Sequence, residues 1–285
     1  MPLLPFQEAP SELLSLFHTE KESILARCLE PEPGLFIAES AKVTVRAADA
    51  GYSMKAMLID DAQLNREAQE LLSRFPEVPA YHAPTREYLE ISGYPMTRGV
   101  LSLFRRKQRS RPDPPDRAGR AKEDPFSLVS SGSCRRIAVL EEVSNPANIG
   151  AIFRNAAALG IDAVLLSAGC CDPLARRCLR VSMGCIFQVP WSMTGLSGAQ
   201  IAENLKGLGI RTAAMALSAD SVPVSDPSLK EALRLAVFLG NEGNGLPAKT
   251  IGSCDLVVRI PMRDGVDSLN VAAASAVTFW ETRRS

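Results

Sequence analysis

The chain has 285 residues, of which 46% are hydrophobic and 22% are charged, a composition typical of globular proteins. The 32 Lys and Arg residues balance 32 Asp and Glu residues, so bulk electrostatic attraction to nucleic acid is not expected. No run approaches the ~20 consecutive apolar residues of a membrane-spanning helix. The N-terminus lacks the basic start and apolar core of a signal peptide. The length favours two domains.

The cysteines and histidines argue against a metal centre. The seven cysteines include no Cys-x-x-Cys pair, although Cys170, Cys171, Cys178 and Cys185 are close in sequence. With 2 histidines in the chain, a zinc site is not supported. We therefore interpret the cysteines as free thiols and expect a cytoplasmic protein, because that compartment keeps thiols reduced.

The charges are distributed unevenly along the chain. Residues 1–104 have 9 Lys/Arg against 15 Asp/Glu, residues 105–122 have 8 against 2, and residues 126–285 have 15 against 13. The middle segment is also rich in proline and poor in large apolar residues, which is typical of a linker. We predict a first domain at 1–104, a basic Pro-rich linker at 105–125 and a second domain at 126–285. The linker charges are equally consistent with a solvated spacer and with contact to RNA phosphates.

The first domain alternates short apolar strands with helices. Residues 20–30 have helical spacing and are followed by Pro-Glu-Pro-Gly, which ends a helix. The other predicted elements are strands at 35–38, 54–59, 78–81 and 100–104 and helices that end at Ala50, span 62–74 and lie near 85–91. His82 has no carboxylate, serine or cysteine nearby in sequence, and we interpret it as structural. Nothing in this domain indicates catalysis.

The second domain alternates strands and helices more regularly. Predicted strands are 136–141, 163–167, 186–190, 210–216, 235–239 and 256–260, and predicted helices are 149–159, 173–183, 197–207, 247–251 and 269–281. This spacing favours a parallel sheet covered by helices on both faces. Such sheets bind ligands beyond the carboxyl ends of their strands, and polar, small-residue segments follow three of the predicted strands.

The first of these segments, residues 144–155, opens a helix. Ser144 or Asn145 can cap that helix, with Pro146 at an early position. Arg154 lies in an otherwise apolar helical run, so we expect it to have a phosphate or carboxylate partner. Asn148 is six residues earlier, about 240° away around the helix axis. A capping asparagine and a surface arginine would explain this segment equally well.

The second and third segments are rich in glycine and other small residues. Residues 239–247 (LGNEGNGLP) follow an apolar strand, and their glycines allow a tight turn and a close approach of a ligand. They match neither a dinucleotide fingerprint nor a P-loop, so nucleotide binding is not supported. Residues 260–271 (IPMRDGVDSLNV) lead into an Ala-rich helix, for which Ser268 is the expected N-cap.

Together, the three segments resemble, in order and spacing, the sequence motifs of the SpoU/TrmH-like RNA 2′-O-ribose methyltransferases of the SPOUT superfamily. The resemblance covers residues 135–281 and includes the intervening stretch 180–190 (RVSMGCIFQVP). The first domain resembles, more loosely, the small L30e-like RNA-binding domain of many family members. Arg98 stands where those members often have His or Gln, which leaves RNA contact at that point open.

The resemblance implies an α/β fold in which the second domain is a SPOUT domain, a parallel sheet with a deep trefoil knot. It implies S-adenosylmethionine as the methyl donor, an RNA substrate, no metal, and a homodimer formed through the second domain. The residues that it assigns to the cofactor are Leu217, Gly240, Asn241, Ile260, Met262 and Leu269.

The resemblance assigns the reaction to Arg154, and the residues that would orient it and the ribose are Asn148, Glu242, Ser268 and Asn270. A ribose 2′-hydroxyl is barely ionised at neutral pH, so methyl transfer needs proton removal or stabilisation of the alkoxide. Because a guanidinium is effectively always protonated, we interpret Arg154 as a phosphate anchor and alkoxide stabiliser. A role as base requires a site that strongly perturbs it.

Two alternatives remain within the family: an RNA-binding member without catalysis, and an enzyme that methylates a base. The presence of all five polar positions argues against the first, and the Arg with Ser-x-Asn favours ribose over base. We expect ribosomal RNA as the first choice of substrate and tRNA as the second, since the two-domain build is common among enzymes that act on ribosomal RNA.

Overall fold

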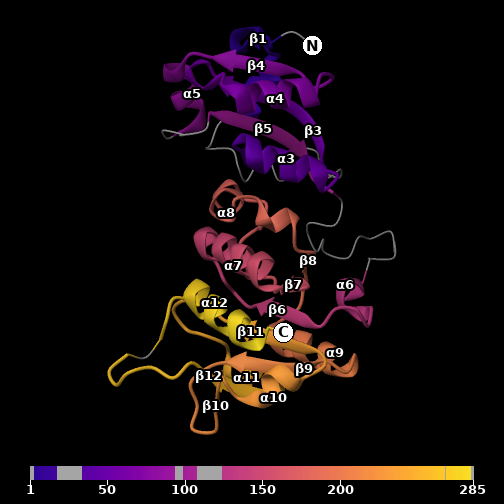
Figure 1. Cartoon of the computed structure of the whole chain (residues 1–285), viewed down its shortest axis with the longest axis vertical. Coiled ribbons are helices and arrows are strands. Elements are labelled where there is room, and N and C mark those ends of the chain that lie inside the picture. Colours follow the sequence, from indigo (N-terminus) through magenta and orange to yellow (C-terminus); the bar gives the residue numbers. More distant parts are fainter. Residues whose placement is uncertain (1–2, 18–33, 94–98, 108–123, 267, 284–285) are drawn as a thin grey trace. The chain divides into compact units, whose positions relative to one another are not determined.

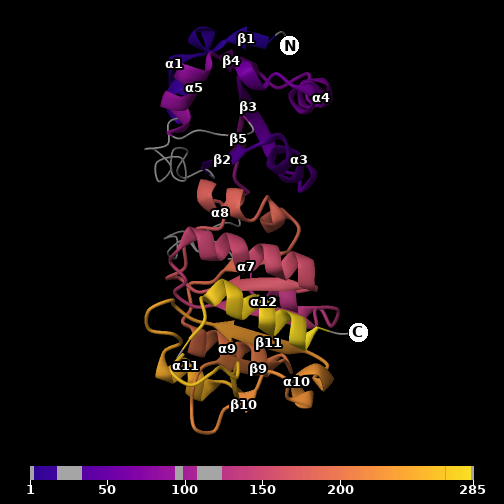
Figure 2. The same cartoon turned by 60° about the vertical axis from the view of Figure 1, so that its left-hand side comes forward.

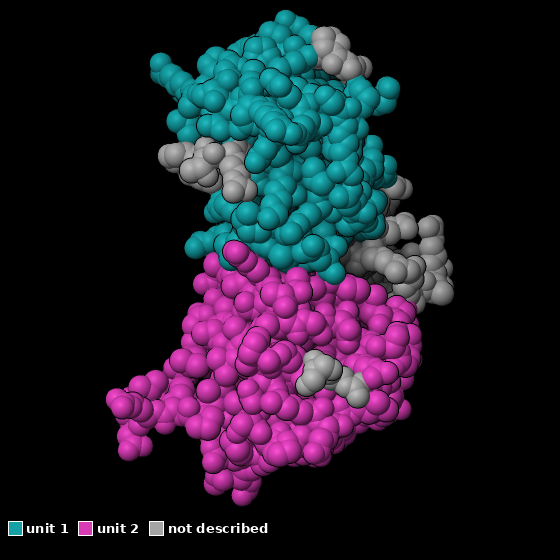
Figure 3. Space-filling view, viewed as in Figure 1, with its two compact units in different colours: residues 1–108, 174–188 teal, residues 109–173, 189–285 magenta. Residues whose placement is uncertain are grey.

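The computed structural model describes residues 3–17, 34–93, 99–107, 124–266 and 268–283. The chain forms two compact units, unit 1 with residues 1–108 and 174–188, and unit 2 with residues 109–173 and 189–285 (Figure 3). The sequence division placed 174–188 in the second domain, whereas its contacts group it with unit 1. The predicted helix at 20–30, Arg98 and most of the linker lie outside the described residues.

Unit 1 is built on a mixed five-stranded sheet of order β1-β4-β3-β5-β2 (Figure 1). The strands are β1 (Leu3–Pro5), β2 (Leu35–Glu39), β3 (Ser53–Asp60), β4 (Ala80–Ala83) and β5 (Val100–Arg105). β4 runs parallel to β1 and β3, whereas β5 is antiparallel to β2 and β3. The helices are η1 (Phe6–Glu8), α1 (Ser11–Leu16), α3 (Ala41–Asp49), η3 (Asp61–Gln63), α4 (Arg66–Arg74) and α5 (Thr85–Ser92).

Residues 174–188 add α8 (Arg176–Val181) and the turn η5 (Cys185–Phe187) to unit 1. The strand predicted at 186–190 is therefore wrong, and β8 (Trp191–Met193) begins after it. Tertiary packing overrides the apolar pattern, because the ring of Phe187 lies 5.9 Å from that of Phe36 and 5.3 Å from that of Tyr52. Gly184, at φ +77°, turns the chain into η5.

Unit 2 contains a seven-stranded sheet of order β10-β12-β9-β11-β6-β7-β8, and every pairing in it is parallel (Figure 1). Its other strands are β6 (Arg136–Leu140), β7 (Ala163–Leu166), β9 (Arg211–Met215), β10 (Val222–Pro223), β11 (Leu235–Leu239) and β12 (Leu256–Arg259). The predicted parallel sheet is confirmed. The two-residue strand β10 is too short to leave a periodic signal.

Helices cover both faces of this sheet. α7 (Pro146–Leu159) packs against α12 (Val271–Thr282), and α9 (Gly198–Gly207) packs against α11 (Ala248–Ser253) (Figures 1 and 2). Short helices α6 (Ser127–Ser130) and α10 (Pro227–Glu231) complete the unit. Alternate strand residues such as Val139 and Phe238 share one buried cluster with Leu205 of α9. The residues between them, such as Val237, are buried as well, so the strands read as continuous apolar runs. Within the described residues, no helix is long and apolar enough to cross a membrane.

Candidate functional site

The three polar segments meet at the carboxyl edge of the unit 2 sheet. They follow β6, β11 and β12, and β9 and β11 lie between β12 and β6 in the sheet. Because all these strands are parallel, the residues that follow them gather at one edge. This arrangement agrees with the expectation from the sequence.

The first segment forms the start of α7 as predicted. Asn145 is the N-cap, and its side-chain oxygen accepts a hydrogen bond from the backbone N–H of Ala147 at 2.9 Å. Pro146 is the first helical residue, where its missing N–H costs nothing. The cap directs Asn148, in the first turn, inward, and only 8% of its surface is exposed.

The side chain of Asn148 joins all three segments. Its Nδ2 donates to Oε1 of Glu242 at 2.7 Å, and its Oδ1 accepts from Nδ2 of Asn270 at 3.1 Å. Both ends of a nearly buried amide are therefore satisfied, which fixes its orientation. Glu242 and Asn270 are 94 and 122 residues away in sequence, so this chain of bonds exists only in the folded unit.

Hydrogen bonds of Asn241 fix the shape of the glycine-rich loop after β11. Asn241 Oδ1 accepts from the backbone N–H groups of Gly243 at 2.7 Å and Asn244 at 3.2 Å, and Asn241 Nδ2 donates to the carbonyl of Glu142 at 2.9 Å. Paired backbone bonds between Asn241 and Gly245 close the loop. A Cβ on Gly240 would lie 2.4 Å from the carbonyl carbon of Gly245, so only glycine fits there.

The third segment corrects one prediction. Asn270, and not Ser268, caps α12, because the helix begins at Val271 and Asn270 Oδ1 accepts from the backbone N–H of Ala272 at 2.9 Å. Asn270 therefore caps a helix with its oxygen and binds Asn148 with its nitrogen. Ser268 is exposed two residues before that cap.

Of the phosphate or carboxylate partner expected for Arg154, the described residues supply no carboxylate. Arg154 is exposed, and no hydrogen bond or ion pair joins it to another residue in the part of the chain that the structure describes. The buried face of α7 is formed by Ile149, Ile152, Phe153 and Ala156, and Arg154 is on the opposite side of the helix. The structure therefore does not place Arg154 in the hydrogen-bonded group with Asn148.

The residues assigned to the cofactor lie after three neighbouring strands. Gly240 and Asn241 follow β11, Leu217 follows β9, and Ile260 and Met262 follow β12. Leu217 and Leu269 are 59% and 41% exposed, which is high for leucine, whereas Ile260 and Met262 are partly buried. This edge therefore combines exposed apolar side chains with a glycine backbone.

One contact was missed from the sequence. Asn155 Nδ2 donates to the carbonyl of Ala272 at 2.8 Å and to the hydroxyl of Ser275 at 2.9 Å, and these bonds tie α7 to α12. The available signal was an asparagine within an apolar helical run, directly after Arg154. Asn155 therefore fixes the two helices that begin at the candidate site.

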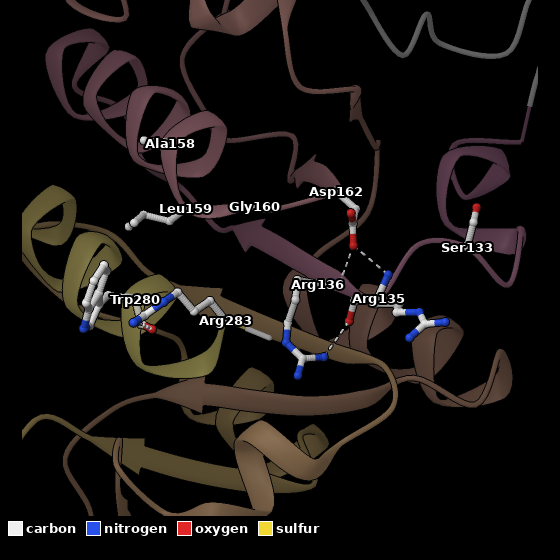
Figure 4. A pocket seen from close by; sticks show the side chains of 9 residues that line it. All are labelled: Ser133, Arg135, Arg136, Ala158, Leu159, Gly160, Asp162, Trp280 and Arg283. Atoms are coloured by element: carbon white, nitrogen blue, oxygen red, sulfur yellow. Dashed lines mark hydrogen bonds between the residues drawn. The ribbon is translucent and has the colours of Figure 1, made fainter. Parts of the chain in front are cut away.

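An open cavity lies at the opposite, amino edge of the sheet. It has a volume of about 410 Å³ and is lined among others by Arg136, Asp162, Trp280 and Arg283 (Figure 4). The buried guanidinium of Arg136 donates to the carbonyls of Thr282, Arg135, Ala232 and Lys230 at 2.7 to 3.1 Å. Burial lowers the pKa of Arg136. The hydrogen bonds of Arg136 therefore connect strand and helix ends at this edge. Among all described residues, no group of three or more His, Cys, Asp or Glu could hold a metal ion.

Comparison with known proteins supports the resemblance. The model of the SpoU rRNA Methylase family matches residues 135–280. An uncharacterized tRNA/rRNA methyltransferase of Mycobacterium tuberculosis is 36% identical over 253 residues, which cover 88% of this chain and 81% of that protein. The 23S rRNA (guanosine(2553)-2'-O)-methyltransferase RlmP of Bacillus subtilis is 31% identical over 151 residues, 53% of this chain and 59% of that protein.

Solved structures share the fold. The SpoU methyltransferase AviRb from Streptomyces viridochromogenes, in complex with the cofactor AdoMet, aligns with a TM-score of 0.70 at 21% identity and covers 95% of this chain and 96% of its own. The α/β fold with a parallel sheet is thus that of known SpoU methyltransferases. With the motif order, the strand-end geometry and the matched family model in agreement, this chain belongs to the SpoU rRNA methylase family of RNA methyltransferases.

Proposed function

We propose that this protein transfers a methyl group from S-adenosylmethionine to a ribose 2′-hydroxyl in structured RNA, with ribosomal RNA as the first candidate and tRNA as the second. The observation that carries the proposal is the Asn148 amide, which joins Glu242 and Asn270 and so unites the three family motifs. The name of the Bacillus subtilis relative, a 23S rRNA 2'-O-methyltransferase, supports ribose as the acceptor and ribosomal RNA as the substrate.

The carboxyl edge of the sheet fits an adenosine-containing cofactor. Such ligands need apolar contact for the base together with a few backbone donors and acceptors. The exposed side chains of Leu217 and Leu269 supply apolar surface, and the backbone of Gly240, Ile260 and Met262 supplies polar groups beside the loop that Asn241 closes. When bound, S-adenosylmethionine supplies the reactive methyl group. The loop closed by Asn241 would hold the backbone in place for it.

In this proposal Arg154 acts on the RNA. An exposed guanidinium that has no partner among the residues the structure describes is available for a phosphate, to which it can donate two parallel hydrogen bonds. The same charge favours the alkoxide that forms as the 2′-hydroxyl loses its proton. Glu242 and Asn270, held by Asn148, would orient the ribose, with Ser268 beside them.

We further propose that the protein acts as a homodimer through unit 2, as the resemblance implies. Ala273, Val277 and Trp280 form an exposed apolar row on α12 at helical spacing, and 55% of the Trp280 surface is exposed. Burying this row in a second copy would bring the partner close to α7, which packs on α12 and carries Arg154. The trefoil knot in unit 2, the L30e-like character of unit 1 and a cytoplasmic location belong to the same proposal.

The direct test maps 2′-O-methylated nucleotides in total RNA from cells with and without the gene. We expect one or a few ribose methylations, in ribosomal RNA, to disappear on deletion and to return with the wild-type gene. Calorimetry with S-adenosylmethionine supplies a second readout. A lack of measurable cofactor binding, together with an unchanged methylation map, would overturn the proposal and favour a non-catalytic RNA-binding protein.

A further inference from the structure

The glycine-rich loop after β11 contains the one Asn-Gly dipeptide of the chain, Asn244-Gly245. Asparagine is a chemically labile residue, because the backbone nitrogen of the next residue can attack its side-chain amide. A following glycine favours this attack, since it has no side chain to keep the two groups apart. The dipeptide lies in the loop to which the resemblance assigns part of the cofactor site, so a change in its main chain would reach that site.

The side chain of Asn244 is free to react. It is exposed and makes no hydrogen bond to another residue in the part of the chain that the structure describes. The backbone N–H of Asn244 is fixed, because it donates to Oδ1 of Asn241 at 3.2 Å. The residues on both sides, Gly243 and Gly245, add no side chains around it. The Asn244 amide is therefore open to water and can rotate toward the main chain.

The nitrogen that would attack this amide is held in the folded loop. The backbone N–H of Gly245 donates to the carbonyl of Asn241 at 3.0 Å, and the N–H of Asn241 donates back to the carbonyl of Gly245 at 3.2 Å. Attack requires this nitrogen to lose its proton and its bond to Asn241. The paired bonds therefore slow the reaction but do not prevent it, since the bonds of exposed loops open and close in the native state.

The loop has no room for a longer main chain. Its ends are joined by the paired bonds between Asn241 and Gly245, and a Cβ on Gly240 would already lie 2.4 Å from the carbonyl carbon of Gly245. Isoaspartate, the product of this chemistry, adds one carbon to the main chain, so the two bonds cannot both persist. It also places a carboxylate two residues after Glu242, where like charges repel.

We propose that Asn244 is a site of spontaneous deamidation, which converts the loop after β11 into a form that no longer binds S-adenosylmethionine. The nitrogen of Gly245 bonds to Cγ of Asn244 and gives up its proton, and the side-chain nitrogen leaves as ammonia. Water then opens the resulting succinimide ring at the former main-chain carbonyl, which yields isoaspartate. One water is consumed and one ammonia released, with no oxidation or reduction. The effect on cofactor binding rests on the proposed function, whereas the deamidation does not.

The test incubates freshly purified wild type and Asn244→Gln at pH 8 and 37 °C, both in the native state and in urea. Glutamine keeps the backbone N–H that Asn241 accepts from, but its amide is one carbon further from the main chain, so ring closure is slower. Mass spectrometry of the loop peptide follows the gain of about 1 Da and separates isoaspartate from aspartate. Calorimetry with S-adenosylmethionine follows cofactor binding in refolded or native samples taken at the same times.

We expect Asn244 in native wild type to be converted in part to isoaspartate, about 10-fold more slowly than in urea. The fraction of native protein that binds S-adenosylmethionine should fall in step with unmodified Asn244, whereas Asn244→Gln keeps the binding of the fresh protein. An unchanged Asn244 in aged native protein, modified protein that binds like fresh protein, or equal loss of binding in Asn244→Gln would overturn the inference.

The proposed function can fail separately in the same experiment. Fresh wild type that binds no S-adenosylmethionine would overturn the proposed function and, with it, the effect of deamidation on cofactor binding. The mass of the loop peptide would still decide whether Asn244 is the modified residue, because that readout does not depend on methyl transfer.

Discussion

The two edges of the unit 2 sheet both contain arginines, but they use them in opposite ways. At the amino edge, Arg136 is buried and donates to four backbone carbonyls, and Arg234 donates to the carbonyls of Cys134, Leu208 and Val129. On α7, the helix that starts at the carboxyl edge, Arg154 is exposed and has no partner in the described part of the chain. The amino edge has a cavity of about 410 Å³, yet Arg136 and Arg234 there already donate to the backbone.

This difference separates structural from chemical roles better than cavity size does. The buried Arg136 has four of its five N–H donors engaged by carbonyls, and it stabilises the ends of strands and helices. An exposed guanidinium on the same helix as Asn148 can still act on something that binds. The comparison predicts that substitutions at the carboxyl edge change activity, whereas those at the amino edge change stability.

The largest effect is expected for Gly240→Ala. The added methyl group would lie 2.4 to 2.6 Å from backbone atoms of Gly245 and Leu246, so the loop must open. We expect loss of measurable S-adenosylmethionine binding by calorimetry and complete loss of transfer. Gly252→Ala on α11 is the control, because its Cβ would meet nothing within 4 Å. Wild-type cofactor affinity in Gly240→Ala would show that this loop does not hold the cofactor.

The next effect concerns the carboxylate that Asn148 holds. Glu242→Ala removes the 2.7 Å bond and frees Asn148, and we expect turnover to fall by about 100-fold through lost positioning. Because Glu242 is exposed, the free energy of unfolding should change by less than about 1 kcal/mol. The exposed Lys249→Ala on α11 is a control for the same region. Equal turnover in Glu242→Ala and Lys249→Ala would remove Glu242 from the site.

At the amino edge, Arg136→Met should cost stability without affecting chemistry. It leaves four carbonyls without their donor at a residue that is 3% exposed, and we expect a loss of about 3 kcal/mol or more in the free energy of unfolding. Urea titration measures this loss, and exposed Arg135→Ala is the matched control. Turnover per folded molecule, measured well below the transition, should equal that of wild type. A turnover defect in well-folded Arg136→Met would contradict the claim that residues at the amino edge affect stability and not activity.

The smallest effect concerns two thiols at the amino edge, the buried Cys134 and the partly buried Cys254. Burial raises the pKa of Cys134 to about 11 and that of Cys254 to about 12. Thiolate is the reactive form, so at pH 8 only a thousandth or less of either thiol is ionised, on the order of 10⁻³ for Cys134. We expect iodoacetamide to leave both unmodified in the native protein and to modify both in urea, as followed by peptide mass spectrometry. Rapid native labelling would mean that this edge opens.

Much of this could be predicted from the sequence, and the failures have physical causes. The parallel sheet follows from regular strand–helix alternation, and the site edge follows from polar segments after strands. The roles of Ser268 and Asn270 could not be separated, because either can cap a helix and only the backbone decides where α12 starts. The packing of residues 174–188 in unit 1 could not be predicted from the sequence, because the hydrogen bond from Arg176 to Glu39 joins residues 137 positions apart. Asn155 was overlooked because its partners lie on a helix distant in sequence.

We propose that the carboxyl edge of unit 2 methylates ribose, with Arg154 acting on the RNA. The most direct measurement follows transfer of labelled methyl from S-adenosylmethionine to ribosomal RNA taken from cells that lack the gene, for wild type, Arg154→Lys and Arg154→Ala. We predict transfer to a 2′-hydroxyl by wild type, residual transfer by Arg154→Lys and none by Arg154→Ala, with equal cofactor affinity in all three. Wild-type turnover in Arg154→Ala, or methyl groups found on bases, would contradict this account.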